Sequence, residues 1–146
     1  MITIREPKKE ELEEMYLLRW EILRKPLGLP KGTEMDDKEK SSYKVIAFDE
    51  ENKKIVGSAR LNIEPKNVGK VRFVCTHYSL RSQGFGRKMM DYLHQKAKEL
   101  EIKKIELYAR KTAEGFYHRL EYVSLEEFFS GPPYNMQEVR MRLIVK

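Results

Sequence analysis

The sequence predicts an α/β protein in which helices pack on one mixed β-sheet. Strands dominate the first half of the chain and helices alternate with strands in the second half, an order that fits a sheet covered by helices. A length of 146 residues allows one sizeable core but not two ordinary domains, and 40% of the residues are hydrophobic. We therefore expect residues 1–146 to form a single domain.

The first predicted elements are a short strand at 3–6 and a helix that Pro7 opens and that continues to about residue 24. Its apolar stripe consists of Leu12, Met15, Tyr16, Ile22 and Leu23. Arg19 falls on the same stripe, so its guanidinium either reaches solvent along its own stem or meets an anionic partner inside. Residues 25–40 are rich in Pro, Gly and charge, and they predict a long loop with at most one helical turn.

Three strands follow at 42–48, 54–63 and 70–76, separated by turn sequences. Because side chains alternate along a strand, the second strand is expected to place Ile55, Gly57, Ala59, Leu61 and Ile63 on one face. The third strand is expected to place Val71, Phe73 and Cys75 on one face.

The principal helix spans 86–101, because apolar residues recur there at intervals of three and four. Its expected core face consists of Met89, Met90, Leu93, Ala97 and Leu100. A strand at 103–109, a short helix at 112–120 and strands at 122–129 and 138–145 complete the chain.

The principal helix begins in RSQGFGRK, residues 81–88, where two glycines lie between basic side chains. The first N–H groups of a helix have no intrahelical partner, and the helix dipole favours an anion at that end. Glycines let these N–H groups converge, and Arg81, Arg87 and Lys88 add positive charge. The segment therefore predicts a pyrophosphate site, with a tight strand-to-helix turn without a ligand as the alternative. The spacings of the dinucleotide-binding and P-loop motifs are absent.

Three segments follow one another along the chain: the strand KVRFVCT, then RSQGFG, which matches R-x-x-G-x-G, and then AEGFYHRLEYV after another strand. In this combination the chain resembles the GNAT N-acetyltransferase superfamily over essentially its whole length. The resemblance implies the GNAT acyltransferase fold, a mixed, mostly antiparallel central sheet flanked by helices. It also implies acetyl-CoA as co-substrate and direct attack on its acetyl group by a primary amine.

The same resemblance implies roles for individual residues. Backbone groups of Val74, Cys75 and Thr76 would bind the pantetheine arm. The pyrophosphate would be held by Arg81, Ser82, Gln83, Gly84, Phe85, Gly86, Arg87 and Lys88. Tyr117 would be the catalytic proton donor to the leaving thiolate, with a purely structural core aromatic as the alternative.

Two positions depart from the family pattern: Glu121 stands where Gly is usual, and Arg110 stands where Asn is common. The first departure bears on the local turn geometry, and the second on a customary polar contact. The segment LRWEILR, followed by a Pro/Gly loop, resembles uncharacterised members that carry R-x-x-V/I-L-R.

Acetyl transfer requires a neutral amine, whereas an alkylamine is mostly protonated at neutral pH. Candidate bases are Glu34, Asp36, Asp37, Glu64 and His77, and none stands out. An N–H near Val74 or Cys75 would stabilise the oxyanion. Cys75 itself is expected to be a buried structural thiol, because no His/Asp arrangement frames it. We expect no metal, because His94 and His118 lack partners at a ligand-like spacing.

The 29 basic and 23 acidic side chains give a net charge of +6, which favours anionic ligands. We expect no nucleic-acid partner, because no readout motif accompanies this charge. A single cysteine and the lack of a signal or membrane-spanning segment predict a cytoplasmic protein with no membrane partner.

The expected acceptor is a small-molecule or peptide amine, and a homodimer is left open. Glu34, Asp36, Asp37 and Glu39 in or beside the long loop would attract a cationic acceptor. A CoA-binding regulatory module without turnover is the second hypothesis, and a basic nucleic-acid-binding domain is the third.

Overall fold

The chain forms seven strands and three α-helices in a computed structural model that describes residues 1–146. The strands are β1 (Ile2–Arg5), β2 (Tyr43–Asp49), β3 (Lys54–Glu64), β4 (Val68–Thr76), β5 (Lys104–Arg110), β6 (Val123–Phe129) and β7 (Gln137–Ile144). The helices are α1 (Leu12–Leu23), α2 (Phe85–Glu99) and α3 (Glu114–Arg119). The predicted strands and helices are all present in the predicted order, with boundaries that differ by a few residues.

All seven strands belong to one sheet in the order β1-β2-β3-β4-β5-β7-β6. Neighbouring strands are antiparallel except β4 and β5, which are parallel. These two strands pair only where Val68 to Lys70 of β4 meets Lys104 to Glu106 of β5. Beyond that point they diverge, so the edge of β4 that faces β5 has no strand partner. The predicted fold class, a mixed and mostly antiparallel sheet flanked by helices, is confirmed.

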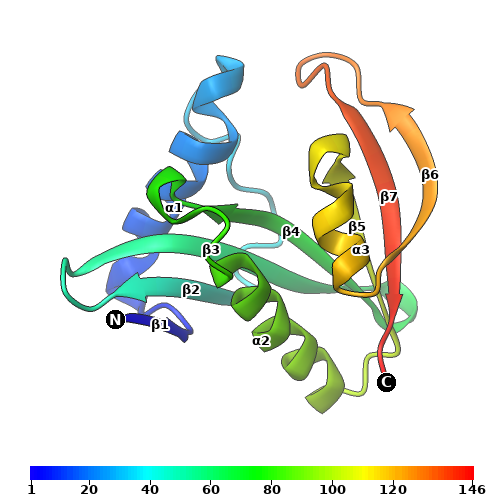
Figure 1. Cartoon of the computed structure of the whole chain (residues 1–146), viewed down its shortest axis with the longest axis horizontal. Helices are drawn as coiled ribbons and strands as arrows, with labels where there is room; N and C mark the ends of the chain where they lie inside the picture. Colours follow the sequence, from blue (N-terminus) through cyan, green and yellow to red (C-terminus); the bar gives the residue numbers. More distant parts are fainter.

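Helices cover both faces of the sheet (Figure 1). Helix α1 packs on one face over a small core that contains Met15, Leu18, Ile22, Ile46, Ile55 and Cys75. Helices α2 and α3 lie on the other face over a larger core, to which α2 contributes Met89, Met90, Leu93 and Ala97. Figure 1 shows β1 to β4 running across the view and β6 and β7 running steeply along its right side. None of the helices combines the length and the apolar composition needed to cross a membrane.

A β-bulge in β4 changes which of its side chains share a face. Phe73 has φ at 57°, and the pairing of β3 with β4 shifts register beside it. Val71 therefore packs into the core under α2, whereas Cys75 packs under α1. The prediction that Val71, Phe73 and Cys75 share one face is wrong, because the extra residue reverses the alternation between Val71 and Cys75.

Two further predicted core positions also differ from the structure. The pairing of β2 with β3 shifts register after Ala47, so Ile55 turns to the α1 face while Ala59 and Leu61 remain under α2. Leu100 is 37% exposed, because α2 ends at Glu99 and the chain turns away there.

Candidate active site

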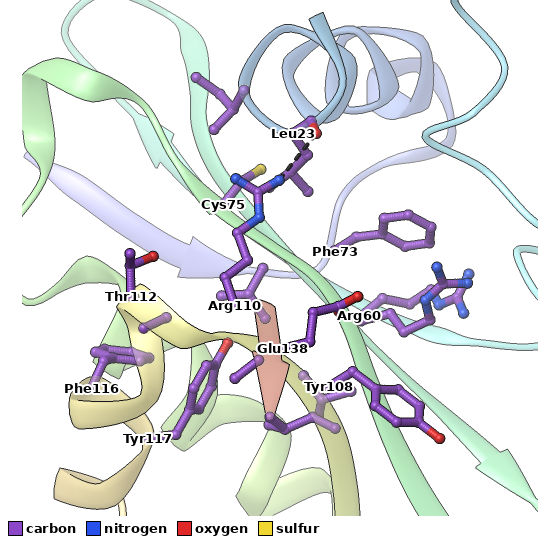
Figure 2. Close-up of a pocket in the computed structure, with 18 of the residues that line it drawn as sticks. Leu23, Arg60, Phe73, Cys75, Tyr108, Arg110, Thr112, Phe116, Tyr117 and Glu138 are labelled. Carbon is purple, nitrogen blue, oxygen red and sulfur yellow. Dashed lines mark hydrogen bonds between the residues drawn. The ribbon is translucent and has the colours of Figure 1, made fainter. Parts of the chain in front are cut away.

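The divergence of β4 and β5 opens a cleft of about 1530 Å³. One end of the cleft is lined by the first turn of α2 and by α3. The other end is lined by the last residues of α1, by residues 36–38 of the long loop and by the loop between β6 and β7. Figure 2 shows side chains from both halves of the sheet pointing into this space. A ligand that enters at α2 can therefore reach the α1 face by passing between the two strands.

The N-terminal end of α2 has the geometry that its glycine-rich sequence predicts. Gly84 is the N-cap and has φ at 86°, a left-handed conformation that favours glycine. The N–H of Lys88 donates to the carbonyl of Gly84 at 3.1 Å, so the N–H groups of residues 85–87 have no intrahelical acceptor. Together with the helix dipole and the guanidiniums of Arg81 and Arg87, these groups can bind an anion.

Most of the residues predicted to bind the cofactor line this cleft. They are Val74, Cys75, Thr76, Arg81, Ser82, Gly84, Phe85, Gly86 and Arg87. Gln83 and Lys88 do not line it: the Gln83 amide donates to the carbonyl of Ser79 at 3.2 Å, and the Lys88 ammonium lies 5.4 Å from the ring centroid of Phe85. Arg119 of α3 lines the same end, although no sequence motif singled it out.

Gly86 keeps open the space where α2, α3 and β4 meet. A Cβ atom at this position would lie 3.3 Å from Cζ of Phe116 on α3 and 3.9 Å from Oγ1 of Thr76 on β4. A side chain at residue 86 would therefore narrow the passage that leads from the N-terminal end of α2 to the gap between β4 and β5. Glycine at residue 86 therefore keeps this passage open, whereas the left-handed glycine of the turn is Gly84.

Tyr117 projects from α3 into the cleft and is 7% exposed. Its ring packs edge-on against the rings of Phe116 and Tyr122, with centroids 5.0 and 5.7 Å away. Figure 2 shows its hydroxyl pointing towards the space beside Arg110. Burial raises the pKa of Tyr117 above its ordinary value, and the charge of Arg110 acts in the opposite direction. The phenol therefore keeps its proton at neutral pH.

Cys75 lines the cleft but is 5% exposed, and burial raises the pKa of its thiol to about 12. The thiol is therefore protonated at neutral pH, as a structural residue requires. The bulge at Phe73 interrupts pairing with β3, and β4 lacks a partner towards β5 at this level. Backbone polar groups near Val74 are consequently available to a ligand.

The candidate bases predicted from sequence are distributed differently. Glu64, Asp36 and Asp37 line the cleft, whereas His77 does not and instead contacts Oγ of Ser79 at 2.8 Å through Nδ1. Glu34 is 6% exposed and accepts a bond from the N–H of Gly32 at 2.6 Å.

Asp36 is held as a carboxylate by its neighbours. Burial alone would raise the pKa of Asp36, but hydrogen bonds from Arg60 and the N–H of Lys38 outweigh burial and hold that pKa below its ordinary value. Sequence reasoning missed Glu138, a cleft-lining carboxylate on β7 opposite Arg110 in the strand register. Only the long-range pairing of β5 with β7 reveals its position.

A buried ion-pair network holds the long loop after α1 against the sheet. Arg60 is fully buried and donates to the carboxylate of Asp36 at 2.6 and 2.9 Å and to that of Glu39 at 2.7 Å. Arg19, also fully buried, donates to Glu39 at 3.0 Å. Arg72 reaches Asp36 at 2.7 Å. Of the two sequence-based interpretations of Arg19, an anionic partner inside is confirmed.

This network changes the expected role of the loop carboxylates. Asp36 and Glu39 are neutralised by arginines, and Glu34 is buried with a backbone partner. Three of the four carboxylates predicted to attract a cationic acceptor therefore already have partners within the protein, and the cationic acceptor itself stays a prediction. Asp37 alone among them is exposed.

The two departures from the family pattern have clear structural consequences. Glu121 has φ at 72°, the left-handed conformation that glycine favours, and it still ends α3 in an ordinary capping turn, with the N–H of Tyr122 donating to Tyr117 O at 3.0 Å. Arg110 extends from β5 to the end of α1, where its Nη2 donates to the carbonyl of Leu23 at 3.1 Å (Figure 2). The turn after α3 is therefore retained with Glu121 in place of glycine. The side chain of Arg110 makes its polar contact with the C-terminal end of α1.

The model of the acetyltransferase (GNAT) family matches residues 10–122. The chain belongs to the GNAT acetyltransferase family. It is 29% identical over 119 residues to YjcF, an uncharacterised N-acetyltransferase of Bacillus subtilis (strain 168), an alignment that covers 82% of this chain and 83% of that protein. The sequence-based assignment to this superfamily is thereby confirmed.

Solved structures of GNAT proteins share the fold. An acetyltransferase of the GNAT family from Staphylococcus aureus Mu50 superposes with a TM-score of 0.79 at 17% identity, covering 100% of both chains. An aminoglycoside 6'-N-acetyltransferase complexed with coenzyme A superposes with a TM-score of 0.80 at 13% identity, covering 99% of this chain and 97% of that one. At such identities the likeness shows the fold alone.

Proposed function

We propose that the protein transfers the acetyl group of acetyl-CoA to a primary amine, with residues 1–146 acting as one N-acetyltransferase domain. The observation that carries the proposal is the continuous cleft from the basic N-terminal end of α2, between β4 and β5, to the α1 face. Membership of the GNAT family and the likeness to a coenzyme A complex support it.

The donor fits the residues at the α2 end of the cleft. The free N–H groups of residues 85–87 and the side chains of Arg81 and Arg87 would hold the pyrophosphate. The space beside Gly86 admits a narrow chain, and the unpaired edge of β4 near Val74 to Thr76 would bind the pantetheine amides. When bound, acetyl-CoA supplies a thioester carbonyl that an amine can attack.

The chain's own groups would manage the protons of this reaction. As the new C–N bond forms and the C–S bond breaks, the amine gives up a proton and the departing thiolate gains one. Tyr117, protonated and buried at the cleft wall, is the proposed donor to sulfur. Glu138, a carboxylate lining the same cleft, is the proposed acceptor from the amine, directly or through water.

We further propose that the acceptor is a small-molecule or peptide amine. The net charge of +6 would serve anionic small ligands rather than nucleic acid or membranes. The protein would work in the cytoplasm and without a metal. Acetyl-CoA is the proposed co-substrate, and a homodimer is compatible with this assignment.

The test is an assay of thiol release from acetyl-CoA with a panel of amines, with mass spectrometry of the product. Thiol release that depends on both the protein and an amine, with acetylation of that amine, is expected. Binding of acetyl-CoA without turnover on any amine would favour a CoA-binding regulatory module instead.

A further inference from the structure

Arg24 and Arg110 bring their positive charges to one point at the α1 end of the cleft. Both line the cleft, as does Arg72. One guanidinium N–H of Arg24 and one of Arg110 donate to the same oxygen, the carbonyl of Leu23, at 3.3 and 3.1 Å. Residues from the end of α1 and the end of β5 therefore converge on a single carbonyl group.

Arg24 is 7% exposed, and its recorded hydrogen bonds go to backbone carbonyls rather than to a carboxylate. Its Nε donates to Thr33 O at 3.0 Å. Burial lowers the pKa of Arg24, and the charges of Arg72 and Arg110 act in the same direction, whereas Tyr134 and Glu34 act to raise it. The Glu34 carboxylate accepts from the N–H of Gly32 and is not hydrogen-bonded to Arg24. A buried guanidinium beside two like charges is stabilised by an anion, and a guanidinium has more N–H donors than Arg24 uses here.

The carboxylates nearby do not provide that anion. Asp36 binds Arg72, but it also receives two hydrogen bonds from Arg60. Glu138 lies opposite Arg110 in the register of β5 and β7, yet Figure 2 shows the two side chains pointing in different directions. Arg24 and Arg110 thus form no ion pair with a carboxylate, and Glu138 forms none with a cation.

We propose that the acceptor is an amino acid whose carboxylate binds Arg24 and Arg110 and whose amino group is drawn to Glu138. The inference rests on the proposed acetyl transfer and names its substrate class. The phosphates of the donor belong at the N-terminal end of α2, on the opposite face of the sheet from α1, so an anion site beside α1 serves the other ligand. Paired guanidinium N–H groups suit a carboxylate, which accepts two hydrogen bonds at once.

The rings of Phe73 and Tyr134 define the surroundings of this site. The guanidinium of Arg24 lies 5.5 Å from the centroid of Phe73 and 5.0 Å from that of Tyr134. Tyr134 comes from the loop between β6 and β7, so that loop contacts Arg24. The structural alternative is that the two arginines only cap the last carbonyls of α1.

The experiment compares the twenty common amino acids with their amino acid amides, using thiol release from acetyl-CoA. Each amide keeps the amine and the side chain and removes only the negative charge. Its amine also has the lower pKa and is therefore more often neutral, which favours the amide in the absence of a carboxylate site. We expect the best acid to exceed its amide in kcat/KM by about tenfold or more, as for a charge-assisted contact.

Arg24→Gln removes the guanidinium and leaves a neutral polar side chain. We expect it to raise KM for the acid about 10–100-fold, with KM for acetyl-CoA and kcat/KM for the amide within about threefold of wild type. Arg24→Lys keeps the positive charge but lacks the planar guanidinium, so its KM for the acid should lie between those of the wild type and of Arg24→Gln. Arg142→Gln is the matched control, because Arg142 lies on β7 outside the cleft and pairs with Glu106, which does not line the cleft either.

The wild-type protein alone also tests the proposal, which matters if the Arg24 variants fail to fold. The 2-hydroxy acid with the same side chain as the best substrate carries a hydroxyl in place of the amine. It should inhibit competitively with respect to the amino acid, but not competitively with respect to acetyl-CoA. Amides or simple amines that react as well as the acids would overturn the amino acid acceptor while leaving acetyl transfer intact. Absence of transfer to every amine would overturn the proposed function itself.

Discussion

Replacing Arg60 by methionine should destabilise the protein more than any surface substitution of the same kind. Arg60 is fully buried and donates to Asp36, to Glu39 and, at 3.0 Å, to the side chain of Asn62. Methionine fills much of the space but removes the arginine that both carboxylates share. As cationic partners, Asp36 then keeps only Arg72 and Glu39 keeps only Arg19, and the Asn62 oxygen loses its donor. Removing one partner of a buried ion pair costs about 3–5 kcal/mol. For a chain of this length, that corresponds to a fall in melting temperature of about 6–20 °C.

Arg142→Met provides the matched control, because it also removes two bonds to one carboxylate. Arg142 donates to Glu106 at 2.9 and 2.7 Å, but its side chain is 32% exposed, so we expect a loss of about 1 kcal/mol or less. Urea unfolding followed by circular dichroism gives both free energies of unfolding. If Arg60→Met loses no more stability than Arg142→Met, the buried network does not hold the loop and our reasoning about it fails.

Three other predictions concern Tyr117, Glu121 and Glu11. Tyr117→Phe should lower kcat by roughly 10²–10⁴-fold with an unchanged dissociation constant for acetyl-CoA, since only the proton donor is lost; an unchanged kcat would remove Tyr117 from the mechanism. Glu121→Gly should raise the free energy of unfolding by about 0.5–1 kcal/mol, because glycine adopts the left-handed conformation at φ of 72° without strain; a stability loss in urea unfolding would contradict this. Hydrogen bonds from Arg5 lower the pKa of Glu11 from 4.5 to about 2, so the stability from this pair is present above pH 4.5 and is lost as the pH falls towards 2. Arg5→Gln should flatten that part of the stability profile, and an unchanged slope would rule out the pair as its source.

The order of elements and the glycine-opened start of α2 could be predicted because their signals are local. The apolar spacing of α2 and the glycines before it lie within one short segment, and helix geometry fixes what that segment does. Tyr117 depended on a family resemblance, and its burial in the cleft wall became visible only in the structure.

The remaining features depend on contacts between distant parts of the chain. The alternation of side chains along a strand does not predict the bulge at Phe73, which places Val71 and Cys75 of β4 on opposite faces of the sheet. Arg60 stands at a polar position of β3 that would face solvent in an open sheet, but α1 and its loop cover that face. Glu138 joins the cleft only through the pairing of β7 with β5. These are tertiary effects that local patterns do not encode.

Titration of the wild-type protein and of Gly86→Val with acetyl-CoA in a calorimeter tests the central claim most directly. We expect the wild type to bind and Gly86→Val to lose about 10–100-fold in affinity, because the added side chain fills the space between α2, Phe116 and Thr76. Gln95→Val is the control: it places the same side chain at an exposed position of α2 that does not line the cleft, and its affinity should match the wild type. A wild-type protein that does not bind acetyl-CoA, or a Gly86→Val variant that binds as tightly as the wild type, would contradict the donor site proposed at α2.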